Sequence, residues 1–249
     1  MKKFICKLAM ILMACIFIYP VLATALLSLW VAGGVTFQAW KDLLFDCFLF
    51  YPMFWNSVGY SLIITLLQLC IVIPGAFGMI MVKGKRWLFG MYPVLMMMPL
   101  QVTLLPNYIG LRDMHLLNTR MCIILPMAFS VAGIVIMHQY METMDLSQIE
   151  AARLETDSIL KILWQIVVPQ MKICIFAVAL FTFEESYNML EQPMLFLKDE
   201  KLQNLTVFIS KAEDFSGDVL FPSAVIFMIP VLILYLWCNS VGEIPTSKR

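Results

Sequence analysis

Four polar side chains interrupt an otherwise apolar stretch near residue 190, and their types and spacing could serve a binding site. Glu184, Asn188 and Glu191 are spaced as i, i+4 and i+7, so they would share one face of a helix, with Glu185 on the adjoining stripe. A carboxylate inside a lipid bilayer costs about 2.5–3.5 kcal/mol on insertion scales, so such groups usually face a water-filled cavity or a partner. Two interpretations stay open: these side chains line a path for a solute, or they hydrogen-bond a neighbouring membrane subunit.

Catalytic and metal-binding patterns are absent from the sequence. There is no H-E-x-x-H and no G-x-S-x-G, and the two histidines, His115 and His138, are expected at interfaces on opposite sides of a membrane. Gly84-Lys85 is not a phosphate-binding loop, because the preceding glycine is one position off and Arg86 stands where Ser or Thr is needed. We therefore expect no catalytic residue, no metal site and no cofactor.

The composition is that of an integral membrane protein. The chain is 61% hydrophobic and 14% charged, against about 45–50% and 25% for an ordinary soluble domain. With 17 basic and 17 acidic residues its formal net charge is zero, which gives no reason to expect nucleic acid as a partner. The seven cysteines form no C-x-x-C pair and are interpreted as small apolar fillers.

Apolar runs long enough to cross a bilayer, which takes about 20 residues, recur along the chain. We predict an all-α integral membrane protein with one domain over residues 1–249 and six transmembrane helices. The first run is too long for a signal peptide, the third should be a broken helix because it carries Pro93, Pro99 and Pro106, and Pro193 should end the fifth. The expected spans are about 8–31, 56–82, 88–109, 121–139, 173–192 and 221–238.

The distribution of Lys and Arg predicts that both termini are cytoplasmic. In that topology eleven basic residues lie inside and six outside, which agrees with the excess of positive charge in cytoplasmic loops. The inner set is Lys2, Lys3, Lys7, Lys83, Lys85, Arg86, Arg153, Lys161, Lys172, Lys248 and Arg249. The outer set is Lys41, Arg112, Arg120, Lys198, Lys201 and Lys211.

Residues 145–170 form a polar island between the fourth and fifth predicted spans, on the cytoplasmic side. A capping box of Asp145 with Gln148, or of Ser147 with Glu150, predicts a helix start. The apolar residues that follow are spaced three and four apart and would give the helix one apolar face for a neighbour that this chain lacks. They are Ile149, Ala152, Ile159, Ile162, Leu163 and Ile166. The island is therefore predicted to dock a soluble partner.

This island resembles the EAA loop of ABC-importer permeases, in which E-A-A, three residues, Gly, nine residues and I-x-L-P follow one another. Glu150, Ala151, Ala152, Ile166 and Pro169 match the motif without a gap, whereas Thr156 replaces its glycine and Val168 its leucine. The resemblance implies that the matching residues, with Thr156, couple the chain to an ATPase. A β-branched residue resists the positive φ that glycine allows, so the turn is built differently here or coupling is weaker.

Further segments resemble the carbohydrate-uptake, maltose-type subfamily of these permeases over about residues 1–240. They are Asn56-Ser57, Met98 to Thr119, Ile124 to Pro126 and Phe181 to Phe183, although Tyr187 stands in place of a tryptophan. The resemblance implies a permease in the bacterial plasma membrane that forms a heterodimer with a second permease. It also implies two cytoplasmic ATPase subunits and an external solute-binding protein. A permease for a non-sugar solute, and a permease-like scaffold without a transport path, remain the alternatives.

Overall fold

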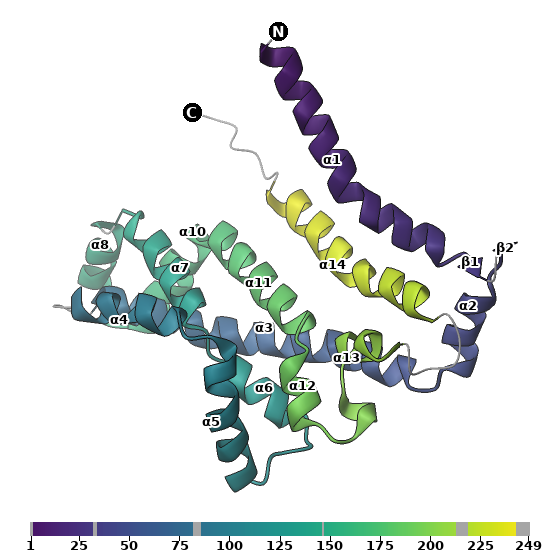
Figure 1. The fold of residues 1–249 in the computed structure, drawn as a ribbon. Coiled ribbons are helices and arrows are strands. Elements are labelled where there is room, and N and C mark those ends of the chain that lie inside the picture. Colours follow the sequence, from purple (N-terminus) through teal and green to yellow (C-terminus); the bar gives the residue numbers. More distant parts are fainter. Residues whose placement is uncertain (1, 32–33, 82–85, 146, 213–218, 243–249) are drawn as a thin grey trace.

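The computed structural model describes residues 2–31, 34–81, 86–145, 147–212 and 219–242, and this part of the chain is almost entirely helical (Figure 1). Of the residues used above, Lys83, Gly84, Lys85, Lys248 and Arg249 lie outside it. The elements are α1 (Lys2–Leu27), β1 (Trp30–Val31), β2 (Gly34–Val35), α2 (Gln38–Lys41), η1 (Asp42–Asp46), α3 (Phe50–Met81), α4 (Arg86–Met96), α5 (Leu100–Asp113), α6 (Met121–Met127), α7 (Val131–Glu142), α8 (Ser147–Glu155), α9 (Ile159–Ile162), η2 (Leu163–Val167), α10 (Val168–Gln170), α11 (Lys172–Tyr187), α12 (Glu191–Phe196), η3 (Glu200–Leu202), α13 (Leu205–Ser210) and α14 (Leu220–Gly242). The all-α class is thus confirmed.

Several helices have the length and apolar character of membrane spans. Within the described residues four helices qualify, and up to six spans result if each of two sharply bent helix pairs counts as one. β1 and β2 form a small antiparallel pair in which Trp30 lies opposite Val35. The helix of the first predicted span ends at Leu27, before the expected limit at residue 31, because the chain turns there into this strand pair.

The long helix α3 is the centre of the fold. It packs along α11 on one side and α7 on the other, and the side chains between them form an apolar core that includes Val72, Phe77, Met137 and Val178. Gly133 of α7 permits this close approach, since a Cβ atom there would lie 3.3 Å from both methyl groups of Val72. Small residues at helix crossings are a general means of packing helices in membranes.

The third predicted span is broken as expected. α4 and α5 are bent by 86° relative to each other, and Pro99 stands at the bend with an extended backbone. The fourth predicted span also contains a break, because α6 ends at Met127 and α7 begins at Val131. Ser130 caps α7 by accepting a hydrogen bond from the N–H of Gly133 at 3.1 Å.

The prediction that Pro193 ends the fifth span was wrong. α11 already ends at Tyr187, with Asn188 as its C-terminal cap, and Pro193 lies in the first turn of α12. Proline is tolerated there because the first N–H groups of a helix have no partner within the helix. The span is therefore shorter than the predicted range 173–192.

The segment from α12 to α13 folds back onto the start of α3. The Asn56 side chain donates to the carbonyls of Lys201 at 2.7 Å and Gln203 at 3.1 Å. Ser57 Oγ accepts from the N–H of Leu205 at 2.7 Å. The Asn56-Ser57 pair therefore fixes this segment through its backbone, which burial would otherwise leave without partners.

Candidate functional site

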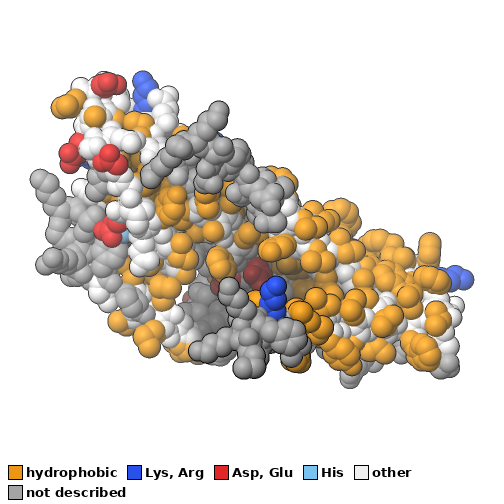
Figure 2. All heavy atoms as spheres, turned by 90° about the horizontal axis from the view of Figure 1, so that it is seen from above, with side chains coloured by type: hydrophobic (Ala, Val, Ile, Leu, Met, Phe, Trp, Pro, Cys, Tyr) orange, Lys and Arg blue, Asp and Glu red, His pale blue; other side chains and the backbone are white. Residues whose placement is uncertain are grey.

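The polar island forms a compact loop of short helices, α8 to α10, between α7 and α11 (Figure 1). Its two arms are joined directly, because Gln170 Nε2 donates to Gln148 Oε1 at 3.0 Å. The helical unit α9 to α10 meets α11 at a bend of 84°. Several acidic side chains gather at the end of the molecule that carries α8, whereas hydrophobic side chains cover much of the same face elsewhere (Figure 2).

The expectation that the apolar face of this loop awaits a missing neighbour was wrong for most of its residues. Ile149, Ala152, Ile162 and Leu163 are buried and belong to the same core as α3 and α11. Ile166 is half-buried and packs against that core. Periodicity identified the buried face correctly but could not tell that the chain itself covers it.

A different set of side chains faces outward from the loop. Leu154 is 91% exposed, and Ile159, Leu160 and Trp164 are also largely exposed. Glu150 and Ala151 lie on the surface as well. We call Ala151, Leu154, Ile159, Leu160 and Trp164 the outer loop face. Sequence reasoning missed most of it, although four large apolar residues among charged ones in a polar island were a signal.

Thr156 is accommodated without the backbone conformation that favours glycine. Among the described non-glycine residues, positive φ values occur at His115 and Asn118, and Thr156 is not one of them. The Thr156 N–H donates to the carbonyl of Ala152 at 3.0 Å, and its hydroxyl accepts from the N–H of Ser158 at 3.3 Å. The turn is therefore built differently from a glycine turn, by a side-chain hydroxyl.

The start of the loop is capped by Asp145. Its carboxylate accepts a hydrogen bond from the Ser147 N–H at 3.0 Å. Hydrogen bonds from the Ser147 side chain and backbone hold the pKa of Asp145 below its ordinary value, because they favour the ionised form. Gln148 was expected as the second member of a capping box with Asp145. Its side chain instead accepts a hydrogen bond from the side chain of Gln170.

Three of the four polar residues of the fifth span come together in the fold. Glu184, Glu185 and Asn188 line one wall of an open pocket of about 410 Å³, and Ala132 and Ile136 of α7 line the other. We call this the polar pocket. Because α11 ends at Tyr187, Glu191 leaves the shared face and instead accepts a hydrogen bond from Gln101 Nε2 of α5 at 3.2 Å.

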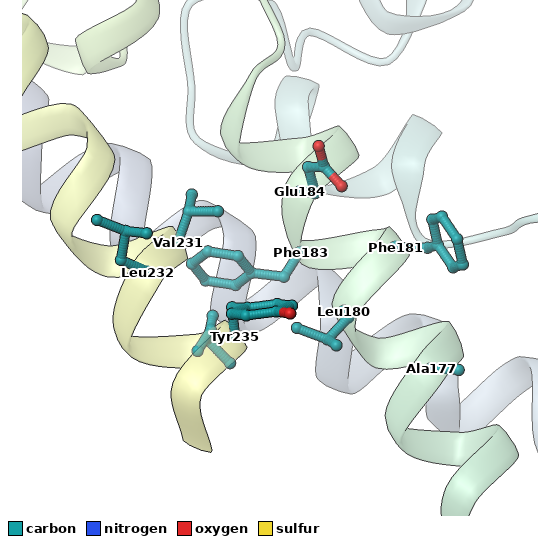
Figure 3. A pocket seen from close by; sticks show the side chains of 9 residues that line it. Ala177, Leu180, Phe181, Phe183, Glu184, Val231, Leu232 and Tyr235 are labelled. Atoms are coloured by element: carbon teal, nitrogen blue, oxygen red, sulfur yellow. The ribbon is translucent and has the colours of Figure 1, made fainter. Parts of the chain in front are cut away.

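A second, apolar groove of about 420 Å³ lies between α11 and α14, with Glu184 at its edge (Figure 3). The aromatic rings of Phe183 and Tyr235 lie between the two helices in that view. Glu184 therefore borders both the groove and the polar pocket. Sequence reasoning had no means of placing α14 beside α11.

The two histidines lie apart from the polar pocket, since neither is among the residues that line it. His138 is fully buried within the chain, with Nε2 3.9 Å from Glu142 Oε1. His115 is exposed. The described residues contain no group of three or more side chains that could hold a metal ion.

The fold of this chain is similar to that of one chain in a solved bacterial transporter. Over 98% of this chain and 96% of the other, it matches a chain from the crystal structure of a bacterial ABC transporter involved in the import of the acidic polysaccharide alginate. The TM-score is 0.84 at 22% sequence identity. This is the fold of an ABC-importer permease.

The chain is also similar to curated permease proteins of two transport systems. The chain is 25% identical over 194 residues to the arabinooligosaccharides transport system permease protein AraQ of Bacillus subtilis, a match that covers 76% of this chain and 69% of that one. It is 21% identical over 189 residues to the sn-glycerol-3-phosphate transport system permease protein UgpE of Brucella abortus, with coverages of 73% and 67%. No protein-family profile matches the chain.

These homologues are transport permeases rather than enzymes. Together with the apolar helices, they make this chain a multi-pass membrane protein.

Proposed function

We propose that this chain is the membrane-spanning subunit of a carbohydrate importer and forms part of the path that the solute takes. The observation that carries this proposal is the match to an importer permease over 98% of the chain, together with homologues from sugar transport systems. The binding protein delivers the solute from outside, and ATP hydrolysis takes place on a separate subunit.

The homologues suggest two kinds of solute, an oligosaccharide and the phosphate ester that UgpE is named for. The polar pocket favours the oligosaccharide. Glu184 and Glu185 place two carboxylates on one wall, and like charges at close range would oppose the passage of an anionic phosphate. A neutral sugar instead finds hydrogen-bond acceptors there. A phosphorylated solute is the second candidate.

Coupling to the ATPase is assigned to the outer loop face together with Glu150. Exposed apolar side chains on a polar loop are the kind of surface that a groove on a partner covers. Thr156, Ile166 and Pro169 act from within the loop by shaping it. Thr156 was the main argument for the scaffold alternative, and the turn that its hydroxyl forms supports coupling over that alternative.

The exposure of the polar pocket supports a second permease beside α11. Glu184 is exposed on α11, a helix of membrane-span character, and Asn188 is exposed just after its end. Lipid is the costliest surroundings for both side chains. We propose a heterodimer of two permeases with two ATPase subunits, and cytoplasmic termini.

The identity of the solute can be tested by ligand binding to the cognate binding protein and by uptake in the reconstituted complex. An arabinooligosaccharide should raise the melting temperature of the binding protein, since a ligand that binds only the folded state stabilises it. The same sugar should be taken up by vesicles only with ATP. Stabilisation by sn-glycerol-3-phosphate but not by neutral sugars would favour the second candidate, and the absence of ATP-dependent uptake of either solute would contradict the transport function.

Substitutions on the outer loop face should weaken ATPase binding while the permease still folds. Leu154→Glu or Ala151→Arg should reduce the amount of ATPase that copurifies by about tenfold or more, because buried contacts at the centre of an interface cost about 2 kcal/mol or more when removed. Met114→Glu, at an exposed position directly after α5, is the control. Ala152→Arg is unsuitable, since Ala152 is buried in the chain's own core. Full ATPase retention in both variants would contradict the assignment.

Membrane orientation is tested by cysteine labelling in a cysteine-depleted background. Asp113→Cys should react with an impermeant reagent added from outside, and Asp157→Cys should react only after the membrane is opened. Both positions are exposed. Reaction of the cysteine at position 157 from outside would reverse the topology and remove the docking assignment with it.

Changes in the polar pocket separate a transport role from an assembly role. Glu184→Gln and Asn188→Ala should change the uptake rate or selectivity by about fivefold or more, the effect of losing one hydrogen bond to a charged or buried group. Basal ATP hydrolysis and the yield of the permease pair should stay nearly constant. If uptake is unchanged and pair formation falls, these side chains serve subunit contact instead.

A further inference from the structure

Gln68 occupies the middle of α3, where it is only 3% exposed. Its carboxamide bonds in two directions. Nε2 donates to the backbone carbonyl of Met127 at 3.0 Å, and Oε1 accepts a hydrogen bond from the hydroxyl of Thr182 on α11. A buried amide is costly in an apolar environment unless it is bonded, and both ends of this one have partners.

The Met127 carbonyl needs such a donor because of the break in the fourth span. α6 ends at Met127 and α7 begins at Val131, so the last carbonyls of α6 lose the donors that a continuous helix would supply. Within a membrane, a freed backbone group must be bonded by neighbouring protein. Gln68 therefore holds the broken end of α6 in place.

Gln68 bonds to the end of α6 and to α11. One wall of the polar pocket is formed by α7, which follows α6, and the other by α11. Met127 precedes α7, which supplies Ala132 and Ile136 to one wall, and Thr182 adjoins Phe181 on the wall formed by α11. The buried Gln68 thus links residues that adjoin the two walls.

Two buried hydroxyls near Gln68 on α3, those of Ser61 and Thr65, make no such link. Ser61 donates to the carbonyl of Ser57, and Thr65 donates to the carbonyl of Ser61, both within α3. These bonds leave neighbouring helices unaffected. They provide a matched comparison for the bonds of Gln68, which cross between helices.

We propose that Gln68 is a positioning residue for transport, which sets the distance between the α7 and α11 walls of the polar pocket. The proposal rests on the proposed function, because it assumes that the solute passes this pocket. Gln68 does not touch the solute and acts through the backbone of Met127 and the side chain of Thr182.

Gln68→Met keeps the size of the side chain and removes both hydrogen bonds. In reconstituted vesicles this variant should change the KM for uptake by about threefold to tenfold, the range that one or two interhelical hydrogen bonds in a membrane support. Thr182→Val should act in the same direction, and the double variant should differ little from Gln68→Met alone, because both remove the same link. Ser61→Ala should leave KM unchanged. Equal changes in KM for Ser61→Ala and Gln68→Met would overturn the proposal.

A second measurement does not depend on transport. Spin labels at positions 136 and 181, both exposed on opposite walls, report the width of the pocket in the purified complex. Gln68→Met should broaden or shift their distance distribution, and Ser61→Ala should not. An unchanged distribution in Gln68→Met would overturn the proposal even if uptake is normal. If the distance distribution changes but the complex takes up no solute, the proposed function is contradicted and the positioning role of Gln68 is not.

Discussion

The structure depends on one constraint: inside a membrane every backbone polar group needs a partner within the protein. The described helices are interrupted between α4 and α5, between α6 and α7, and after α11. Each interruption frees N–H and C=O groups where water is scarce. Side-chain amides and hydroxyls supply the missing bonds, as Gln68 does for Met127 and Ser130 does for Gly133. Several polar side chains in this apolar chain therefore bond the backbone where regular helix stops.

The same constraint explains how the segment after α11 is held. Asn204 donates to the carbonyl of Met189 at 2.6 Å, and the Thr206 hydroxyl donates to that of Tyr187 at 2.9 Å. Asn118, with a φ of 58°, accepts from the N–H groups of Lys198 and Asp199, each at 2.9 Å. Irregular chain can cover the ends of the helices because these side chains bind its backbone groups.

Those features that local composition controls could be predicted from the sequence. Apolar runs predicted the helices, prolines predicted the break near Pro99, and the polar island predicted an exposed loop. The end of α11 could not be predicted, because it depends on how Tyr187 and Asn188 meet the returning chain. The burial of Ile149 and Ala152 in the chain's own core could not be predicted either. A period of 3.6 residues identifies an apolar face but does not show what packs against it. The position of Glu191 outside the polar pocket could not be predicted either, because it depends on a turn after α11 that tertiary contacts determine.

The loop between α7 and α11 has a mechanical consequence. Its two arms are joined by Gln148 and Gln170, and Ile162, Leu163 and Val167 anchor it in the same core as α11. It meets α11 at 84°, with the fully buried Met171 at the corner. Loop and helix therefore form an L-shaped unit whose short arm is the loop and whose long arm ends beside Glu184. Because the corner between them is packed in the core, we expect a force on the short arm to move the long arm with it rather than to bend the corner.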